Sequence, residues 1–256
     1  QIHCYKFKKD KARRFEFFLA AEIDGINTEY TLHIHSMDTA PQLEETLKTN
    51  GVLVMERPRG KPPTLHDPIN KELSYELPNY PNEVSALMMM PDRSLYDYLL
   101  NIRVFRFDPL GAKTPDESNA DASELHPHGH NVATMLATLE SNADIRSQII
   151  DWLELIVPGM TGVSTDKQKL NGGTVIKFKE EGIKAFFPAN LISDGTIYAL
   201  CIMTAVLSRA RKIGMTFIEE PERGLHPKAI EQLVSLMREN AATEHPVFIT
   251  THSESV

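Results

Sequence analysis

Residues 215–222 read Met-Thr-Phe-Ile-Glu-Glu-Pro-Glu, a short apolar run that ends in two adjacent carboxylates. A continuous apolar run of this length is typical of a central parallel strand that is covered on both faces. Two acids directly after a buried strand are costly unless they face a cation or a reacting centre. Phosphoryl-transfer sites use one such acid to orient Mg²⁺ and the next to polarise the attacking water. Glu219 and Glu220 are therefore candidate site residues, with a solvated acidic turn as the alternative.

The elements after this run predict a parallel sheet. Residues 247–249 (Val-Phe-Ile) form a second short apolar run, and Pro227 stands where a helix between the two runs would begin. Four apolar residues share one face of this helix: Ile230, Leu233, Val234 and Met237. Strand, helix and strand in this order make a parallel crossover unit. The expected fold class is α/β, with a mostly parallel sheet flanked by helices, an antiparallel β lobe and a helical lobe.

A second motif lies at the N-terminus of another predicted helix. Its residues are Ile192, Ser193, Asp194, Gly195 and Thr196. The stretch that follows, to Leu207, is apolar nearly all round, which predicts a buried helix. Ser or Asp caps a helix well, and Gly lets another group approach the free N–H groups. Such a helix start can bind phosphate, and a plain capping motif is the alternative.

A third motif, Thr250-Thr251-His252-Ser253, follows the second apolar strand. A histidine at this place can hydrogen-bond a terminal phosphate or a water. A lone histidine at a strand end is more often structural. His252 is therefore a candidate site residue only in combination with the other two motifs.

The N-terminal part predicts an antiparallel lobe. Residues 14–23 and 29–35 are strand-like runs around a hairpin turn at residues 24–27. Residues 41–48 predict a short helix because Pro41 stands at its start. Residues 55–91 lose periodicity and predict a loop or insertion.

The middle of the chain predicts a helical lobe. Apolar residues recur at helical spacing over residues 132–139 and 145–156, which indicates two amphipathic helices. A hairpin is expected next, with residues 174–179 against 183–187. His126, His128 and His130 stand in a polar stretch before these helices, and we favour a solvated loop there over a metal site, since no Cys or paired acid is nearby.

Bulk composition narrows the class of protein. A length of 256 residues can bury one good core, or one core with a smaller subdomain. The net charge of -8 argues against a wholly basic, nucleic-acid-coating surface. The two cysteines, Cys4 and Cys201, do not suggest a disulfide framework, so a reducing cytoplasm fits best. No apolar run approaches the roughly 18 to 20 residues that cross a bilayer, and we expect no membrane partner.

The order and spacing of the three motifs resemble the C-terminal half of an ABC-class ATPase head. The resemblance is closest to the SMC/RecF/OLD-like branch, in which the acidic motif often continues into Glu-x-Gly-Leu-His-Pro. Residues 222–227 read Glu-Arg-Gly-Leu-His-Pro here. The resemblance is specific across residues 190–256.

The resemblance implies roles for each motif. Residues 192–196 match the signature motif, which contacts the γ-phosphate bound by the opposite subunit. Glu219 takes the place of the Walker B acid that orients magnesium, usually an Asp, and Glu220 matches the glutamate that activates water. Residues 222–226 correspond to the D-loop, and His252 to the switch histidine. The implied cofactors are ATP and Mg²⁺.

One departure from the family pattern is severe. The sequence contains no Gly-x-x-x-x-Gly-Lys-Ser/Thr, the Walker A loop that cradles phosphates. We expect this loop to lie in a segment before Gln1, and we expect the chain alone to be inactive. The expected parts are an antiparallel β lobe with a loop insertion (1–110), a helical lobe with a hairpin (111–190), and the signature, Walker B and switch-histidine elements (191–256).

For the intact protein the resemblance implies an ATP hydrolase that works as an ATP-closed homodimer with composite sites. It further implies a role in DNA repair or phage defence, coupled to a nuclease or other effector chain, with DNA as a partner. The alternative is a non-catalytic, ATPase-like scaffold that assembles with a partner protein. The absence of Walker A favours the scaffold, and the retention of Glu220 and His252 opposes it.

Overall fold

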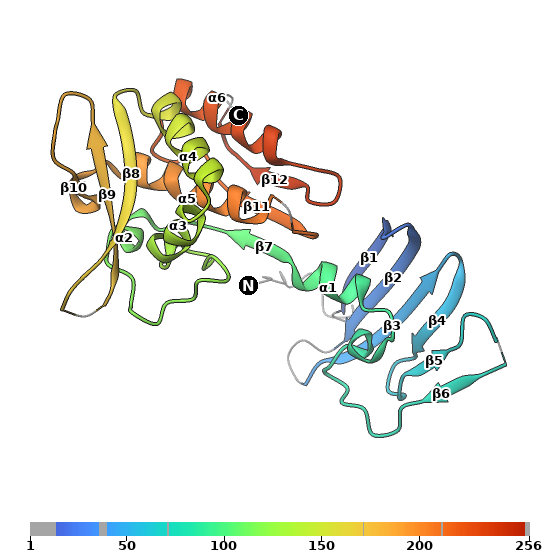
Figure 1. Cartoon of the computed structure of the whole chain (residues 1–256). Coiled ribbons are helices and arrows are strands. Elements are labelled where there is room, and N and C mark those ends of the chain that lie inside the picture. Colours follow the sequence, from blue (N-terminus) through green and yellow to red (C-terminus); the bar gives the residue numbers. More distant parts are fainter. Residues whose placement is uncertain (1–13, 36–39, 71, 171, 211, 254–256) are drawn as a thin grey trace, which may run out of the picture. The chain divides into compact units, whose positions relative to one another are not determined.

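The computed structural model describes residues 14–35, 40–70, 72–170, 172–210 and 212–253 (Figure 1). The chain forms two compact units, residues 1–99 and 100–256. None of the described helices has the length and apolar character that a membrane span requires.

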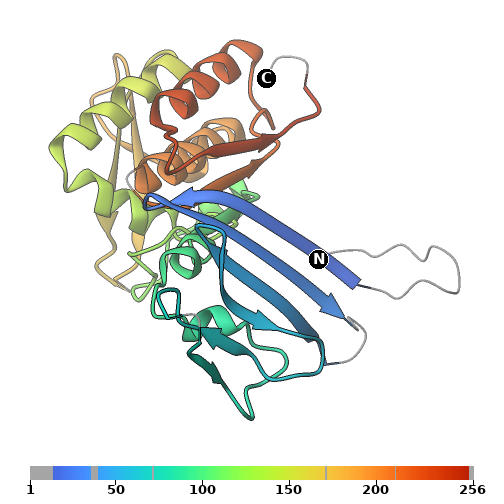
Figure 2. The same ribbon diagram turned by 90° about the vertical axis from the view of Figure 1, so that its right-hand side faces the viewer.

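The first unit is built on a six-stranded antiparallel sheet whose strand order follows the sequence. Figure 2 shows these strands side by side. Its strands are β1 (Arg14–Ile23), β2 (Ile26–His35), β3 (Gln42–Thr49), β4 (Val52–Arg57), β5 (Thr64–His66) and β6 (Ser74–Glu76). The predicted β1–β2 hairpin is confirmed, and Gly25 at its turn has a φ of 76°, which glycine adopts without strain.

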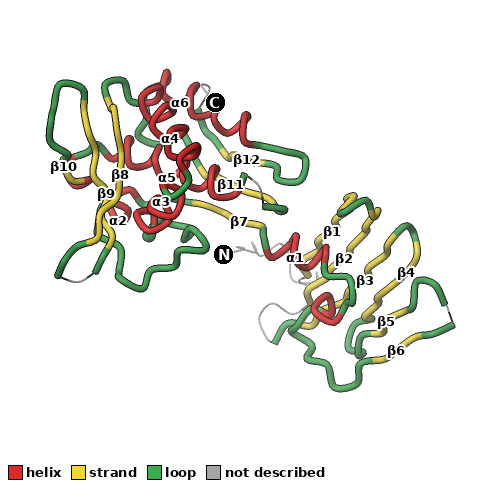
Figure 3. The backbone as a smooth tube through the Cα atoms, in the orientation of Figure 1, coloured by secondary structure: helices red, strands yellow, loops and turns green. Residues whose placement is uncertain are grey.

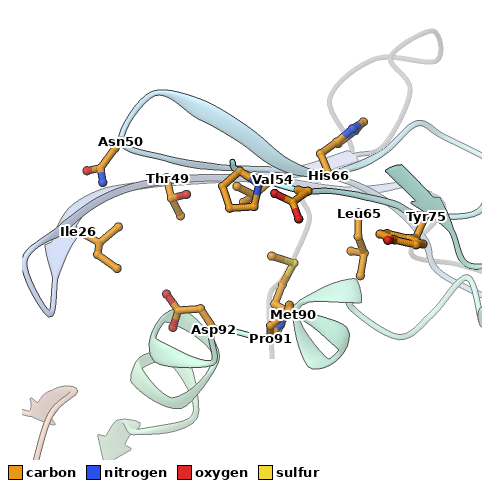
Figure 4. Close-up of a pocket in the computed structure, with 12 residues that line it drawn as sticks. Ile26, Thr49, Asn50, Val54, Leu65, His66, Tyr75, Met90, Pro91 and Asp92 are labelled. Atoms are coloured by element: carbon orange, nitrogen blue, oxygen red, sulfur yellow. The ribbon is translucent and has the colours of Figure 1, made fainter. Parts of the chain in front are cut away.

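One face of this sheet carries the core of the first unit. Tyr30, Leu47 and Met55 are buried against η1 (Ala86–Met89) and α1 (Ser94–Leu100). A hollow of about 380 Å³ lies on the same side, and Figure 4 shows Met90 and Pro91 across it from the strands.

Two expectations for the first unit are wrong. Residues 41–48 do not form a helix, because residues 42–49 are β3 and pair along their length with β2. The segment 55–91 is not a featureless loop, since it includes β5, β6 and η1.

The second unit contains a parallel sheet and an antiparallel sheet. The parallel sheet has the order β12–β11–β7, from β7 (Ile102–Phe105), β11 (Met215–Glu219) and β12 (Val247–Thr250). The antiparallel sheet has the order β10–β9–β8, from β8 (Met160–Lys167), β9 (Thr174–Glu180) and β10 (Phe187–Pro188). The expected α/β class is confirmed, but parallel pairing is limited to three of the described strands.

Helices of the second unit cover one face of the parallel sheet (Figure 3), whereas Val104 and Phe248 on the other face are exposed, so the sheet is not covered on both faces within the described residues. The helices of this unit are α2 (Pro109–Ala112), α3 (Val132–Glu140), α4 (Ala143–Ile156), α5 (Asp194–Arg209) and α6 (Pro227–Asn240), with the short η2 (Ala189–Leu191) before α5. Helix α5 packs against β11 and against each of the other four α-helices. Every residue from Gly195 to Leu207 is buried, which confirms the predicted core helix.

The hairpin expected around Glu181-Gly182 is only partly correct. Strand β9 pairs along its whole length with β8, which the sequence pattern did not predict. Of the expected second arm, 183–187, only Phe187 pairs with β9, and Pro188 just beyond it pairs as well.

Candidate active site

The carboxyl ends of β11 and β12 bring the acidic motif and the histidine motif to one edge of the parallel sheet. Glu219, the last residue of β11, lies in register with Thr250, the last residue of β12. Parallel strands in this register end together, so the residues that follow them are neighbours. The Glu219 and Glu220 side chains are 42% and 50% exposed, which leaves both carboxylates accessible.

The backbone of Glu220 is held in a left-handed conformation. Its φ is 48°, which costs a non-glycine residue about 1 kcal/mol. The Glu220 N–H donates a hydrogen bond to the Thr250 carbonyl at 2.8 Å. This bond between the ends of β11 and β12 stabilises the strained conformation of Glu220. The Glu220 carboxylate lies 3.9 Å from Nε2 of His252. The structure therefore brings together the two residues for which the resemblance implies catalytic roles.

Glu222 ties the two loops to each other. Its carboxylate accepts a hydrogen bond from the Thr251 hydroxyl at 2.8 Å and another from the His252 N–H at 3.0 Å. Desolvation raises the pKa of Glu222. Hydrogen bonds from backbone N–H groups, including those of Glu222 and His252, and from the Thr251 hydroxyl outweigh this effect, so the pKa is lowered overall. An ionised Glu222 therefore positions the backbone that carries His252.

Tyr198 supports both acids from helix α5. Its hydroxyl donates to the carbonyl oxygens of Glu219 and Glu220, at 2.8 and 3.0 Å. Burial raises the pKa of Tyr198 to about 12, so the hydroxyl stays protonated and remains a donor. Sequence reasoning missed this residue, because it belongs to an apolar helix far from the acidic motif in the chain.

The predicted signature motif forms the start of α5. The Ser193 hydroxyl accepts from the Thr196 N–H at 3.1 Å and lies 2.8 Å from the Thr196 hydroxyl, which caps the helix. Asp194 is ion-paired with Lys113. A capped helix start of this kind can bind an anion through its free N–H groups.

The signature motif lies directly against the predicted D-loop. A Cβ atom built on Gly195 would stand 2.3 Å from the carbonyl oxygen of Gly224, which is far inside a normal contact. Only glycine allows this approach of two backbones. The start of α5 and the loop after the acids therefore form one continuous surface.

Arg106 adds a cation beside the acids. It follows β7, and its Nε lies 3.8 Å from a Glu219 carboxylate oxygen. The Arg106 side chain is 71% exposed, so water screens this contact and its contribution to stability is small.

The three histidines of residues 126–130 gather on the same unit. Their ring centroids lie 5.2 to 5.8 Å apart, and His128 Nδ1 is 2.8 Å from the Arg106 carbonyl oxygen. Burial, and then the neighbouring His130 and His128, lower the pKa of His126. These three histidines do not form the candidate metal-ligand cluster found among the described residues. That cluster lies in the first unit.

The donor set at the strand ends suits a nucleotide and its metal. Carboxylate oxygens such as those of Glu219 are the ligands that Mg²⁺ prefers. The capped N-terminus of α5 offers backbone N–H groups to a phosphate.

Comparison with known proteins agrees with this chemistry. The model of a family described as "AAA domain, putative AbiEii toxin, Type IV TA system" matches residues 66–256. The chain belongs to this AAA family. No curated protein matches it.

Two solved structures are similar to this AAA domain. One is an SMC head bound to the C-terminal winged-helix domain of ScpA, with 12% identity and a TM-score of 0.46. The match covers 90% of this chain and 61% of that one, so the chain spans less than two thirds of the length of this SMC head. The other comes from work on ATP-driven dimerisation and DNA-stimulated activation of SMC ATPases. It has 14% identity and a TM-score of 0.37, and the match covers 48% of this chain and 74% of that one.

Proposed function

We propose that this AAA domain is the catalytic head of an ABC-class ATP hydrolase, with Glu220 as the general base. The observation that carries the proposal is the geometry of Glu220. A strained backbone at an exposed, accessible acid is typical of a functional site, and here it is bonded to the end of β12 and directed at His252.

Each residue of the site has a task in this proposal. Bound MgATP supplies the phosphoryl group and the metal charge that neutralises it. Glu220 orients a water and accepts its proton. Glu219 would hold Mg²⁺, and His252 would donate a hydrogen bond to a phosphate or to that water. Tyr198 and Glu222 keep the two acids and the histidine in place.

We further propose that the head works as a homodimer. Ser193, Asp194, Gly195 and Thr196 of one subunit would contact the nucleotide held by the other. The role in DNA repair or phage defence, the cytoplasmic location, and the coupling to a nuclease or other effector rest on the family resemblance. The toxin in the family's description is compatible with a defence role.

The proposal is tested by Glu220→Gln in the intact protein. Gln keeps the size and hydrogen bonding of Glu but cannot accept the proton, so ATP turnover should fall about 100-fold or more while ATP affinity stays within a few-fold. Phosphate release and nucleotide binding measure the two quantities. Glu231→Gln, at an exposed position of α6, is the matched control and should change neither. Turnover within a few-fold of wild type in Glu220→Gln would rule out Glu220 as the base.

A non-catalytic scaffold is the second candidate, because the sequence contains no Walker A loop. Residues 1–256 alone should bind MgATP weakly under either function, since that loop normally supplies most phosphate contacts. Calorimetric titration measures this, and submicromolar binding would contradict it. The intact protein separates the two functions: a head binds and hydrolyses ATP, whereas a scaffold shows no turnover that depends on Glu220.

A further inference from the structure

Two histidines and a glutamate meet on the outer face of the six-stranded sheet in the first unit. His33 and His35 alternate along β2 and therefore share a face. The β2–β3 register places Glu44 directly opposite His33. The Glu44 carboxylate oxygen Oε2 lies 2.8 Å from His35 Nε2 and 3.6 Å from His33 Nδ1.

This cluster is separate from the core of the first unit. Tyr30, Leu43 and Leu47 occupy the alternate positions of β2 and β3 and are buried on the opposite face. His35 is nevertheless only 8% exposed, while His33 and Glu44 are 25% and 38% exposed. The cluster is thus partly enclosed and still reachable from solvent.

We propose that His33, His35 and Glu44 form a zinc-binding site. One ligand atom from each lies within 4.8 Å of the other two. Tetrahedral zinc with nitrogen and oxygen ligands about 2.1 Å away needs ligand atoms about 3.4 Å apart. The His33–Glu44 separation of 3.6 Å is close to this value, and the His35–Glu44 separation of 2.8 Å has to open by about 0.6 Å. The ligand atoms of the two histidines lie within 4.8 Å of each other.

Two carboxylates on this face favour a cation, whereas Arg14 of β1 stands in register with His35. Oε2 of Glu44 lies 3.6 Å from a ring nitrogen of His33 and 2.8 Å from one of His35, so this carboxylate is placed to bind the same ion as both histidines. Glu16 of β1 lies in register with His33 on its other side and adds a second carboxylate to the same face. Two imidazoles and a carboxylate are a common zinc ligand set that leaves the fourth position to water.

A bound zinc ion would cross-link β2 and β3. Ligand binding to the folded state alone stabilises it by mass action. The site lies in the first unit and shares no residue with the proposed ATP site.

The test is zinc titration of the full chain in competition with a chromophoric chelator, with Co²⁺ absorption as a report on tetrahedral coordination. We expect one site that is lost in His33→Ala and in Glu44→Gln, with affinity reduced at least about 10-fold in each. His66→Ala is the matched control, because His66 lies 3.5 Å from Glu56 as a lone His–Glu pair on the same sheet. Zinc should also raise the Tm of wild type and not that of His33→Ala.

His33→Ala decides the proposal, because His33 is the more exposed histidine and its loss should leave the sheet folded, which circular dichroism checks. Zinc affinity that is equal in wild type, His33→Ala and Glu44→Gln would overturn the site. The absence of any binding by folded wild type at 100 µM zinc, about the weakest affinity of a useful site, would also overturn it and leave a simple His–Glu ion pair.

Discussion

Gly195 shows how one residue joins two motifs. It stands in the first turn of α5, where alanine would ordinarily stabilise a helix by about 1 kcal/mol over glycine. The Gly224 carbonyl occupies the space that a Cβ would need. Gly195→Ala should therefore destabilise the protein by about 2 kcal/mol, because overpacking outweighs helix propensity. Urea unfolding measures the change.

Gly162→Ala is the control for this substitution. A Cβ at Gly162 would meet its nearest neighbour, the Lys179 Cβ, at 3.5 Å, an ordinary contact. Its free energy of unfolding should change far less. If Gly195→Ala were as stable as wild type, the close approach of α5 to the loop at Gly224 would be wrong.

At the residue scale, the sequence predicted the site residues that lie within motifs, but not the residues elsewhere in the chain that contact them. Glu220 and His252 adjoin apolar strands, so their neighbourhood followed from the expected parallel pairing. Tyr198 and Arg106 reach the same acids from elements far away in the chain. Local patterns carry no information on which way such side chains point, so they required the structure.

At the element scale, β3 shows why a strand was mistaken for a helix. Its sequence, QLEETLKT, is rich in helix-forming residues and follows a proline. Leu43, Glu45 and Leu47 nevertheless alternate on the buried face. Glu45 can be buried because Arg57 lies 3.3 Å from it and Tyr30 donates to it at 2.9 Å. Those partners come from neighbouring strands, so tertiary pairing overrode local propensity.

A chain of hydrogen bonds links α5, β11 and the entry to β12. Arg209 Nε donates to the Thr216 hydroxyl at 3.1 Å, and this hydroxyl lies 2.7 Å from His245 Nε2. His245 Nδ1 lies 2.6 Å from the Lys212 carbonyl, which can only accept. Nδ1 therefore carries the proton, and Nε2 accepts from Thr216 in a neutral ring.

This network predicts a stability change with pH. Burial is the main cause that lowers the pKa of His245 below its ordinary 6.5, and the Arg209 and Lys212 charges add to it. The unfolded chain then takes up a proton at a higher pH than the folded one. The stabilisation that neutral His245 gives the folded state is fully present above pH 6.5, the pKa of the unfolded chain. It is lost as the pH falls through the lower pKa of the folded state.

As the pH falls from about 7.5 to about 5.5, the free energy of unfolding should decrease less for His245→Asn than for wild type. Urea unfolding at each pH measures this free energy. Ser147→Ala is the control, because Ser147 is exposed on α4 and its side chain has no group that titrates in this range. Its pH slope should match wild type. Parallel slopes for wild type and His245→Asn would show that His245 does not carry this dependence.

At the scale of the whole molecule, the parallel sheet has an open side within the described residues. Strand β12 pairs with β11 on one edge, and its Phe248 is 44% exposed and stacks on Phe217 with ring centroids 4.9 Å apart. The side chains of Phe217 and Phe248 point out of the sheet and not along its edge, so their exposure marks an uncovered apolar face of the sheet within the described residues.

The proposed dimer is tested at Ser193. Losing its cap costs about 1 kcal/mol, and Ser193→Arg also adds bulk where a partner's nucleotide would sit. We expect Ser193→Arg to fold, to bind ATP at its own site, and to lose ATP-dependent dimerisation and turnover together. Asn142→Ala removes a cap of the same kind from α4 and should keep both activities. Size-exclusion chromatography with ATP and phosphate release report the two properties.

Mixing Ser193→Arg with Glu220→Gln decides whether the signature acts across subunits. Neither variant alone should turn over ATP. In a mixed dimer with composite sites, the intact Glu220 of one subunit faces the intact Ser193 of the other, while both defects fall in the second site. Part of the wild-type turnover should therefore return on mixing. If the motif serves its own subunit, each site keeps one defect and the mixture stays inactive, which would rule out the composite arrangement.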